Sequence, residues 1–145
     1  MAMPLIFVLN GPNLNRLGTR QPEIYGDESL DDIAARLVER ATALAVSLDI
    51  RQSNHEGHLI DWLHEAADRG AKAVILNPGG LAHSSVSLHD AAQAIPVPVI
   101  EIHLSNPQAR EGFRRRSLVS AAAQGTIAGF GSEGYLLALD AAARL

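Results

Sequence analysis

Short apolar runs alternate with longer amphipathic segments along this chain, and the alternation restricts the fold more than any other feature. Residues 5–9 form a continuous apolar run, which is typical of a strand buried on both faces. Ser29 precedes a segment whose apolar residues recur at helical spacing, so Ser29 is the expected N-cap of a helix. The pattern predicts strands at residues 5–9, 48–52, 73–76, 97–102 and 126–130 and helices at residues 30–45, 56–69, 86–94 and 134–145.

Five strands separated by helices predict an α/β fold, with a parallel sheet covered by helices on both faces. For a chain of 145 residues, a three-layer sandwich with the flavodoxin-like strand order 2-1-3-4-5 is the default expectation. This length favours one domain, and no repeat or linker-like segment interrupts the pattern. We therefore expect a single domain over residues 1–145.

The composition excludes several kinds of site. The chain has no cysteine, which rules out disulfides, thiolate metal sites and cysteine nucleophiles. It contains no HExxH motif and no GxxxxGK[ST], and we expect no metal and no cofactor. A net charge of −4 argues against a nucleic-acid partner. No apolar stretch reaches the length of about 18 residues that suits a membrane span, and no signal-peptide pattern is present, so a cytoplasmic protein is expected.

Polar residues gather where the first, third and fourth predicted strands end. Ligands in such sheets bind beyond the carboxyl ends of the strands, and these three ends run into residues 10–15, 77–85 and 101–107. The loop over residues 10–27 exceeds the length of about 12 residues above which loops are usually functional or disordered. Its glycines and Pro12 favour a structured lid that includes residues 18–27, with a packed surface loop as the alternative.

Among the six histidines, His103 stands apart because it follows a buried strand. Glu101 lies two residues before it, and residues i and i+2 share one face of a strand, so Glu101 is placed to orient the imidazole. A structural histidine at a strand end is the alternative. Surface or capping roles are expected for the histidines in or beside predicted helices. These are His55, His58, His64 and His89.

Several short motifs occur in order across nearly the whole chain. They are Gly11-Pro12-Asn13-Leu14-Asn15, Arg20, Tyr25-Gly26, Gln52-Ser53-Asn54-His55-Glu56-Gly57, Asn77-Pro78-Gly79-Gly80, His83-Ser84-Ser85, Glu101-Ile102-His103-Leu104-Ser105-Asn106 and Gly134-Tyr135. Each motif is weak alone, but together they are specific, and the chain resembles the type II 3-dehydroquinate dehydratases. The resemblance implies a flavodoxin-like catalytic subunit and trimers that usually assemble into a dodecamer. It also implies anti elimination of water from 3-dehydroquinate through an enolate.

The resemblance further implies roles for individual residues. Tyr25 matches the base that takes the proton, Arg20 matches its activator, and His103 matches the acid. The other matched positions are Asn13 for the water that stabilises the enolate, Asn77, His83 and Arg114 for substrate hydroxyls, the backbone of Leu104 and Ser105 for the carboxylate, and Asp90 for the site of a neighbouring subunit.

Three positions depart from the family pattern. His89 stands beside Asp90 where the family commonly has arginine, and Arg116 and Leu118 stand where histidine and tyrosine are usual. These departures concern the contact between subunits and the region after the fourth strand, so the trimer interface is where the resemblance is least complete.

A tyrosine base needs a positive charge nearby, because its ordinary pKa is about 10. Arg20 is five residues from Tyr25 on the same loop and would favour the phenolate, with Arg16 as the reserve. The unrelated type I dehydroquinate dehydratases use a lysine Schiff base instead. The single lysine here, Lys72, lies at the amino end of the predicted sheet, away from the expected site, which argues against that chemistry.

Two other functions are compatible with the same fold. A receiver-type signalling module needs an acidic cluster after the first strand and an aspartate ending the third, whereas this chain has Asn10 and Asn77 there. An enzyme acting on another hydroxy-acid is the second alternative, and turnover of 3-dehydroquinate would separate the three. The sequence leaves open whether the pathway is shikimate biosynthesis or quinate catabolism.

Overall fold

The computed structural model describes residues 2–19, 21–25 and 27–145, except the side chains of Pro22 and Tyr25. A parallel five-stranded sheet with the order β2-β1-β3-β4-β5 forms the centre. Its strands are β1 (Leu5–Asn10), β2 (Ser47–Gln52), β3 (Ala73–Asn77), β4 (Val99–His103) and β5 (Gly125–Ala128). The predicted flavodoxin-like order is confirmed.

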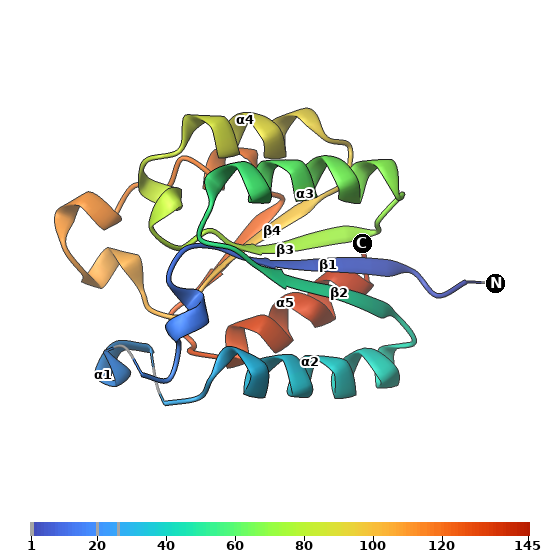
Figure 1. Ribbon diagram of the computed structural model, residues 1–145, viewed down its shortest axis with the longest axis horizontal. Helices are drawn as coiled ribbons and strands as arrows, with labels where there is room; N and C mark the ends of the chain where they lie inside the picture. Colours follow the sequence, from blue (N-terminus) through green and yellow to red (C-terminus); the bar gives the residue numbers. More distant parts are fainter. Residues whose placement is uncertain (1, 20, 26) are drawn as a thin grey trace.

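Helices cover both faces of this sheet (Figure 1). One face carries α2 (Leu30–Leu44) and α5 (Glu133–Ala143), and the other carries α3 (Glu56–Asp68) and α4 (Val86–Ala94). Successive side chains of a strand point to opposite faces, which divides the core in two. In β1, Ile6 and Val8 pack toward α2 and α5, whereas Phe7 and Leu9 pack toward α3 and α4. Burial on both sides explains why this run is apolar at every position.

Ser29 caps α2, as the sequence predicts. Its hydroxyl accepts from the Asp32 N–H at 3.1 Å, and the Asp32 carboxylate accepts from the Ser29 N–H at 3.0 Å. This reciprocal capping box satisfies two N–H groups at the start of the helix. The cap therefore fixes the point where the long loop after β1 ends.

Strand ends differ from the prediction where proline or glycine intervenes. β4 begins at Val99 rather than at residue 97, because Pro96 and Pro98 have no N–H to donate to a neighbouring strand. β5 ends at Ala128 rather than at residue 130, because Gly129 turns out of the extended conformation with a φ of 93°.

Short helices that the apolar pattern does not predict lie around the carboxyl edge of the sheet. They are η1 (Leu14–Arg16), α1 (Pro22–Tyr25), η2 (Gly79–His83), η3 (Pro107–Ala109) and η4 (Gly112–Arg114). Another short helix, η5 (Ser120–Ala122), packs against α4 just before the start of β5. The loop after β1 is thus structured, as expected, through η1 and α1, while Arg20 and Gly26 lie outside the described residues. Within the described parts of the chain, no helix has the length and apolar character needed to cross a membrane.

Candidate active site

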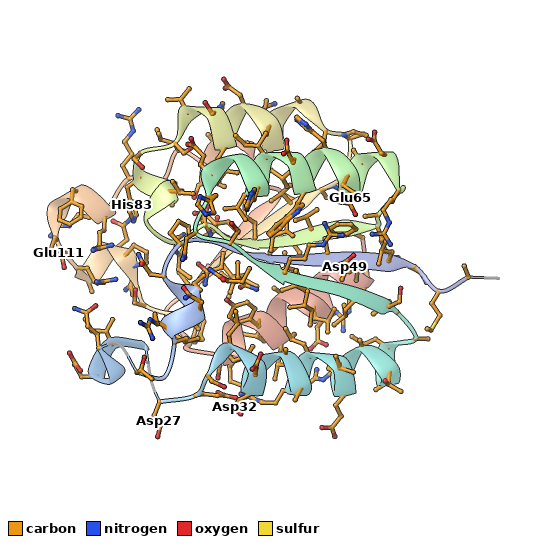
Figure 2. The ribbon with its side chains drawn as sticks, viewed as in Figure 1. Asp27, Asp32, Asp49, Glu65, His83 and Glu111 are labelled. Carbon is orange, nitrogen blue, oxygen red and sulfur yellow. The ribbon has the colours of Figure 1, made fainter. Side chains whose placement is uncertain are left out.

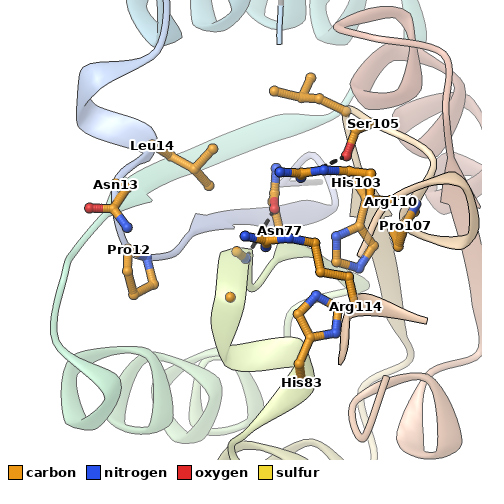
Figure 3. A pocket seen from close by; sticks show the side chains of 13 residues that line it. Pro12, Asn13, Leu14, Asn77, His83, His103, Ser105, Pro107, Arg110 and Arg114 are labelled. Carbon is orange, nitrogen blue, oxygen red and sulfur yellow. Dashed lines mark hydrogen bonds between the residues drawn. The ribbon is translucent and has the colours of Figure 1, made fainter. Parts of the chain in front are cut away.

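A pocket of about 150 Å³ opens at the carboxyl edge of the sheet, where the loops after β1, β3 and β4 meet (Figure 3). His83 and Glu111 mark this edge, whereas Glu65 lies toward the opposite end of the molecule (Figure 2). The pocket is lined by Pro12, Asn13, Leu14, Asn77, Gly79, Gly80, His83, His103, Leu104, Ser105, Pro107, Arg110 and Arg114. The structure therefore brings together seven residues singled out from the sequence, namely Asn13, Asn77, His83, His103, Leu104, Ser105 and Arg114.

Two glycines allow the loops after β1 and β3 to touch. A Cβ on Gly11 would lie 2.7 Å from the carbonyl oxygen of Pro78, and the Gly11 N–H donates to the carbonyl of Asn77 at 2.8 Å. Gly79 has a φ of 57°, in the left-handed region, and its Cβ would lie 3.0 Å from the carbonyl oxygen of Pro12. Larger residues would push the loops apart, so both glycines keep the two loops at one pocket.

A buried carboxylate holds the imidazole of His103. Nε2 of His103 lies 2.6 Å from Oε2 of Glu101, whose side chain is 0% exposed. Burial acts to raise the pKa of Glu101, but hydrogen bonds from His103, Ser120 and Ser117 outweigh it and hold that pKa below its ordinary value. A charged Glu101 accepts the Nε2 hydrogen, which leaves Nδ1 as the ring nitrogen available to a ligand. The contact agrees with the expectation that Glu101 orients His103.

His83 is oriented by the backbone of a different segment. Its Nδ1 lies 2.8 Å from the carbonyl oxygen of Arg116. A carbonyl can only accept, so Nδ1 carries the hydrogen and neutral His83 presents Nε2 as an acceptor. The rings of His83 and His103 are stacked, with centroids 6.4 Å apart and an interplanar angle of 19°. The two imidazoles therefore form one stretch of the pocket wall.

A buried chain of hydrogen bonds orients Asn77. Nδ2 of Asn77 donates to the Tyr135 hydroxyl at 3.0 Å, and that hydroxyl donates to Oδ1 of Asn10 at 2.6 Å. Nδ2 of Asn10 donates to the carbonyl of Arg51 at 3.1 Å, and Oδ1 of Asn77 accepts from the Gly79 N–H at 3.2 Å. Each bond fixes the direction of the next, so the Asn77 amide has one orientation, with its second Nδ2 hydrogen left for a ligand.

Two arginines beyond β4 bring positive charge to the pocket wall. Arg110 donates to the Ser105 hydroxyl at 3.3 Å, and Nε of Arg114 donates to Glu111 at 2.6 Å. The sequence prediction missed Arg110. Its place in a loop beyond a strand end, together with the fit of guanidinium groups to carboxylates, is the signal that could have identified it.

Other predicted site residues lie away from this wall or outside the described residues. Glu101 stands behind His103 and does not line the pocket. Asp90 lies on α4 with its side chain 69% exposed, and it bonds Nδ1 of His89 at 2.9 Å. Tyr25 ends α1, but its side chain lies outside the described part of the chain, as does all of Arg20. The described pocket thus brings together an imidazole held by a carboxylate and several hydrogen-bonding side chains.

This arrangement suits acid catalysis on an anionic, hydroxylated ligand. The pair of His103 and Glu101 can deliver a proton, the side chains of Asn77 and His83 can bind hydroxyls, and the two arginines can attract negative charge. Among the described residues, no three His, Asp or Glu side chains gather in a way that could hold a metal ion.

Comparison with known proteins identifies the family of this chain. Residues 4–143 match the family described as Dehydroquinase class II. The chain belongs to this family. The 3-dehydroquinate dehydratase of Caulobacter vibrioides is 56% identical to this class II dehydroquinase over 137 residues, which cover 94% of this chain and 93% of that protein. The 3-dehydroquinate dehydratase 1 of Agrobacterium fabrum is 55% identical over 137 residues, or 94% of each protein.

Solved structures of type II dehydroquinases have the same fold as this chain. The enzyme from Propionibacterium acnes matches with a TM-score of 0.95 and 45% identity, and 100% of both chains is covered. The enzyme from Butyrivibrio crossotus matches with a TM-score of 0.96 and 36% identity, over 98% of this chain and 99% of that chain. In this class II dehydroquinase, the pocket beyond the strand ends is therefore the candidate active site.

Proposed function

We propose that this class II dehydroquinase is a 3-dehydroquinate dehydratase, which forms 3-dehydroshikimate by anti elimination of water through an enolate. The observation that carries the proposal is the His103–Glu101 pair beside a pocket that also presents Asn77, His83 and Arg114. Loss of hydroxide needs a group that protonates it, and this pair has the geometry to do so. Relatives named 3-dehydroquinate dehydratase support the choice of substrate.

We assign the role of base to Tyr25 and its activation to Arg20. The chain has two tyrosines, and burial raises the pKa of Tyr135 although a hydrogen bond from Asn77 acts to lower it. Tyr135 is therefore a poor base. A cation beside Tyr25 would lower its pKa by about 1 to 3 units, and each unit is worth about 1.4 kcal/mol of base availability.

The remaining roles are assigned from where negative charge develops during the reaction. His103 protonates the leaving hydroxide from Nδ1, because Glu101 holds Nε2. Asn13 holds the water that stabilises the enolate, because the developing negative charge is best stabilised by hydrogen-bond donors that are already in place. Substrate binding is assigned to Asn77, His83 and Arg114 for the hydroxyls and to the N–H groups of Leu104 and Ser105 for the carboxylate. Arg110, bonded to the Ser105 side chain, adds positive charge at that end.

Assembly is part of the proposal. Residues 1–145 would form one catalytic domain of a cytoplasmic trimer, with four trimers in a homododecamer, serving the shikimate or the quinate pathway without a metal or cofactor. The exposed carboxylate of Asp90, off the wall of its own pocket, supports its assignment to a neighbour's site. His89, Arg116 and Leu118 line one surface cavity of about 250 Å³, so the three departures from the family pattern bear on one face.

Ultraviolet absorbance of the conjugated product tests the function. Chelator-treated protein should still dehydrate 3-dehydroquinate. Lys72→Ala should keep near-normal turnover, because the N–H of Lys72 pairs with the Leu5 carbonyl at 2.7 Å, at the amino end of the sheet. Borohydride added with substrate should leave no adduct on the protein. Activity lost to chelator, or an adduct on Lys72, would contradict the proposed chemistry.

A further inference from the structure

Three hydroxyl groups contact the buried carboxylate of Glu101 in addition to His103. The Ser117 hydroxyl lies 2.7 Å from Oε2, the Ser120 hydroxyl bonds to Oε1, and the Thr126 hydroxyl lies 3.4 Å from Oε1. We call Ser117, Ser120 and Thr126 the hydroxyl cage. Its members come from the segment after η4, from η5 and from β5, so tertiary packing brings them to the carboxylate.

In this geometry, the hydroxyls of the hydroxyl cage act as hydrogen-bond donors to the Glu101 carboxylate. The oxygen of Ser117 accepts the Ser120 N–H at 3.2 Å, which directs the Ser117 hydroxyl hydrogen toward Glu101. Oε2 then receives Ser117 and His103, while Oε1 receives Ser120 and Thr126. A carboxylate that accepts several donors is stabilised in its charged form. A protonated Glu101 would give up at least one of these bonds.

The segment that carries the two serines is firmly anchored. The Leu118 N–H donates to the carbonyl of Ala82 at 2.7 Å, and Val119 between the serines is 0% exposed. The carbonyl of Arg116 in the same segment accepts from His83. The serines are therefore held at Glu101 by contacts that do not involve Glu101 itself.

A buried histidine–carboxylate pair can keep its shared proton on either partner. Burial disfavours the ion pair and favours the neutral pair, with the proton on Glu101. Nearby arginines also disfavour a further positive charge on His103, although Glu111 offsets part of this through Arg114. Among the described residues, the other charged or titratable groups lining the cavities beside the pair are His83, Arg110, Arg114 and Arg115. The proton stays on His103 only if Glu101 is stabilised as a carboxylate.

We propose that the hydroxyl cage holds this shared proton on His103 and so keeps the acid protonated at the start of each turnover. Ser117 and Ser120 are the main positioning residues, because the contact of Thr126 is long at 3.4 Å. The inference rests on the proposed function, in which His103 protonates the leaving hydroxide.

The double variant Ser117→Ala/Ser120→Ala tests the cage by nitrogen NMR of histidine-labelled protein at neutral pH, with His103→Asn to assign the resonance. Wild-type His103 should be an imidazolium. In the variant, the ratio of imidazolium to neutral imidazole should fall at least about tenfold, which corresponds to one pKa unit between the partners. The kcat for 3-dehydroquinate should fall in proportion to the fraction of His103 that remains imidazolium, while KM changes little.

Two controls separate this effect from general damage. Ser120→Thr keeps the hydroxyl at an exposed position and should behave as wild type. Ser132→Ala removes a serine–glutamate bond elsewhere, to Glu28 at 2.6 Å, and should leave the His103 resonance unchanged. Ser120→Ala alone provides the same measurement if the double variant does not fold.

The outcomes for the hydroxyl cage and for the proposed function are distinguishable. An unshifted His103 resonance in a folded variant overturns the role of the hydroxyl cage, whatever the activity. A shifted resonance with unchanged kcat supports the hydroxyl cage and contradicts His103 as the acid.

Discussion

Removing the hydroxyl of Tyr135 would break the buried chain of hydrogen bonds behind Asn77. Tyr135→Phe deletes one oxygen from a side chain that is 0% exposed. Nδ2 of Asn77 and Oδ1 of Asn10, its partners at 3.0 and 2.6 Å, then lose their bonds. Each buried polar group left unpaired costs about 1–3 kcal/mol, so the free energy of unfolding should fall by about 2–6 kcal/mol. At about 2–4 °C per kcal/mol, the melting temperature should fall by at least about 4 °C.

Thermal unfolding and steady-state kinetics on 3-dehydroquinate measure the two consequences of Tyr135→Phe. The KM should rise, because the Asn77 amide loses the bond that fixes its orientation. Thr42→Val is the matched control, since it removes an exposed hydroxyl that donates to the Val38 carbonyl at 3.0 Å, and it should change stability by no more than about 0.5 kcal/mol. A melting temperature for Tyr135→Phe equal to that of the control would refute the reasoning.

Three further predictions address the base, acid stability and assembly. Tyr25→Phe should fold and lose turnover by at least about a hundredfold, and Arg20→Ala should shift the alkaline limb of the pH–rate profile; near-normal turnover of Tyr25→Phe would show that another group is the base. Hydrogen bonds from Arg51 and then Arg69 lower the pKa of Glu65 from 4.5 to about 2, so its contribution to stability is present above about pH 4.5 and is lost as the pH falls toward 2. Melting temperatures of Glu65→Gln should therefore depend less on pH in that window, and a pH dependence like that of wild type would count against the assignment. If Asp90 serves a neighbour's site, activity should fall with dissociation in a dilution series followed by light scattering, whereas a fully active monomer would contradict it.

The sequence by itself determined the order of strands and helices and the edge at which the site lies. Apolar spacing distinguishes a buried strand from an amphipathic helix, and the run over residues 5–9 became β1 as predicted. Parallel strands separated by helices place their carboxyl ends together, which predicted that Asn77 and His103 would meet. The pairing of Glu101 with His103 also followed from the sequence, because strand geometry alone puts residues i and i+2 on one face.

Only the tertiary structure decided what surrounds those groups. Asn77 and Tyr135 are separated by 58 in sequence number, and Glu101 and Ser120 by 19. Only tertiary packing brings each pair into contact, and no local sequence pattern indicates it. Arg110 reaches the pocket from a region of short 3-10 turns, where apolar periodicity is absent and spacing predicts no orientation. Local periodicity specifies which face of an element is buried, whereas the direction of a hydrogen bond depends on partners that only the folded chain brings within reach.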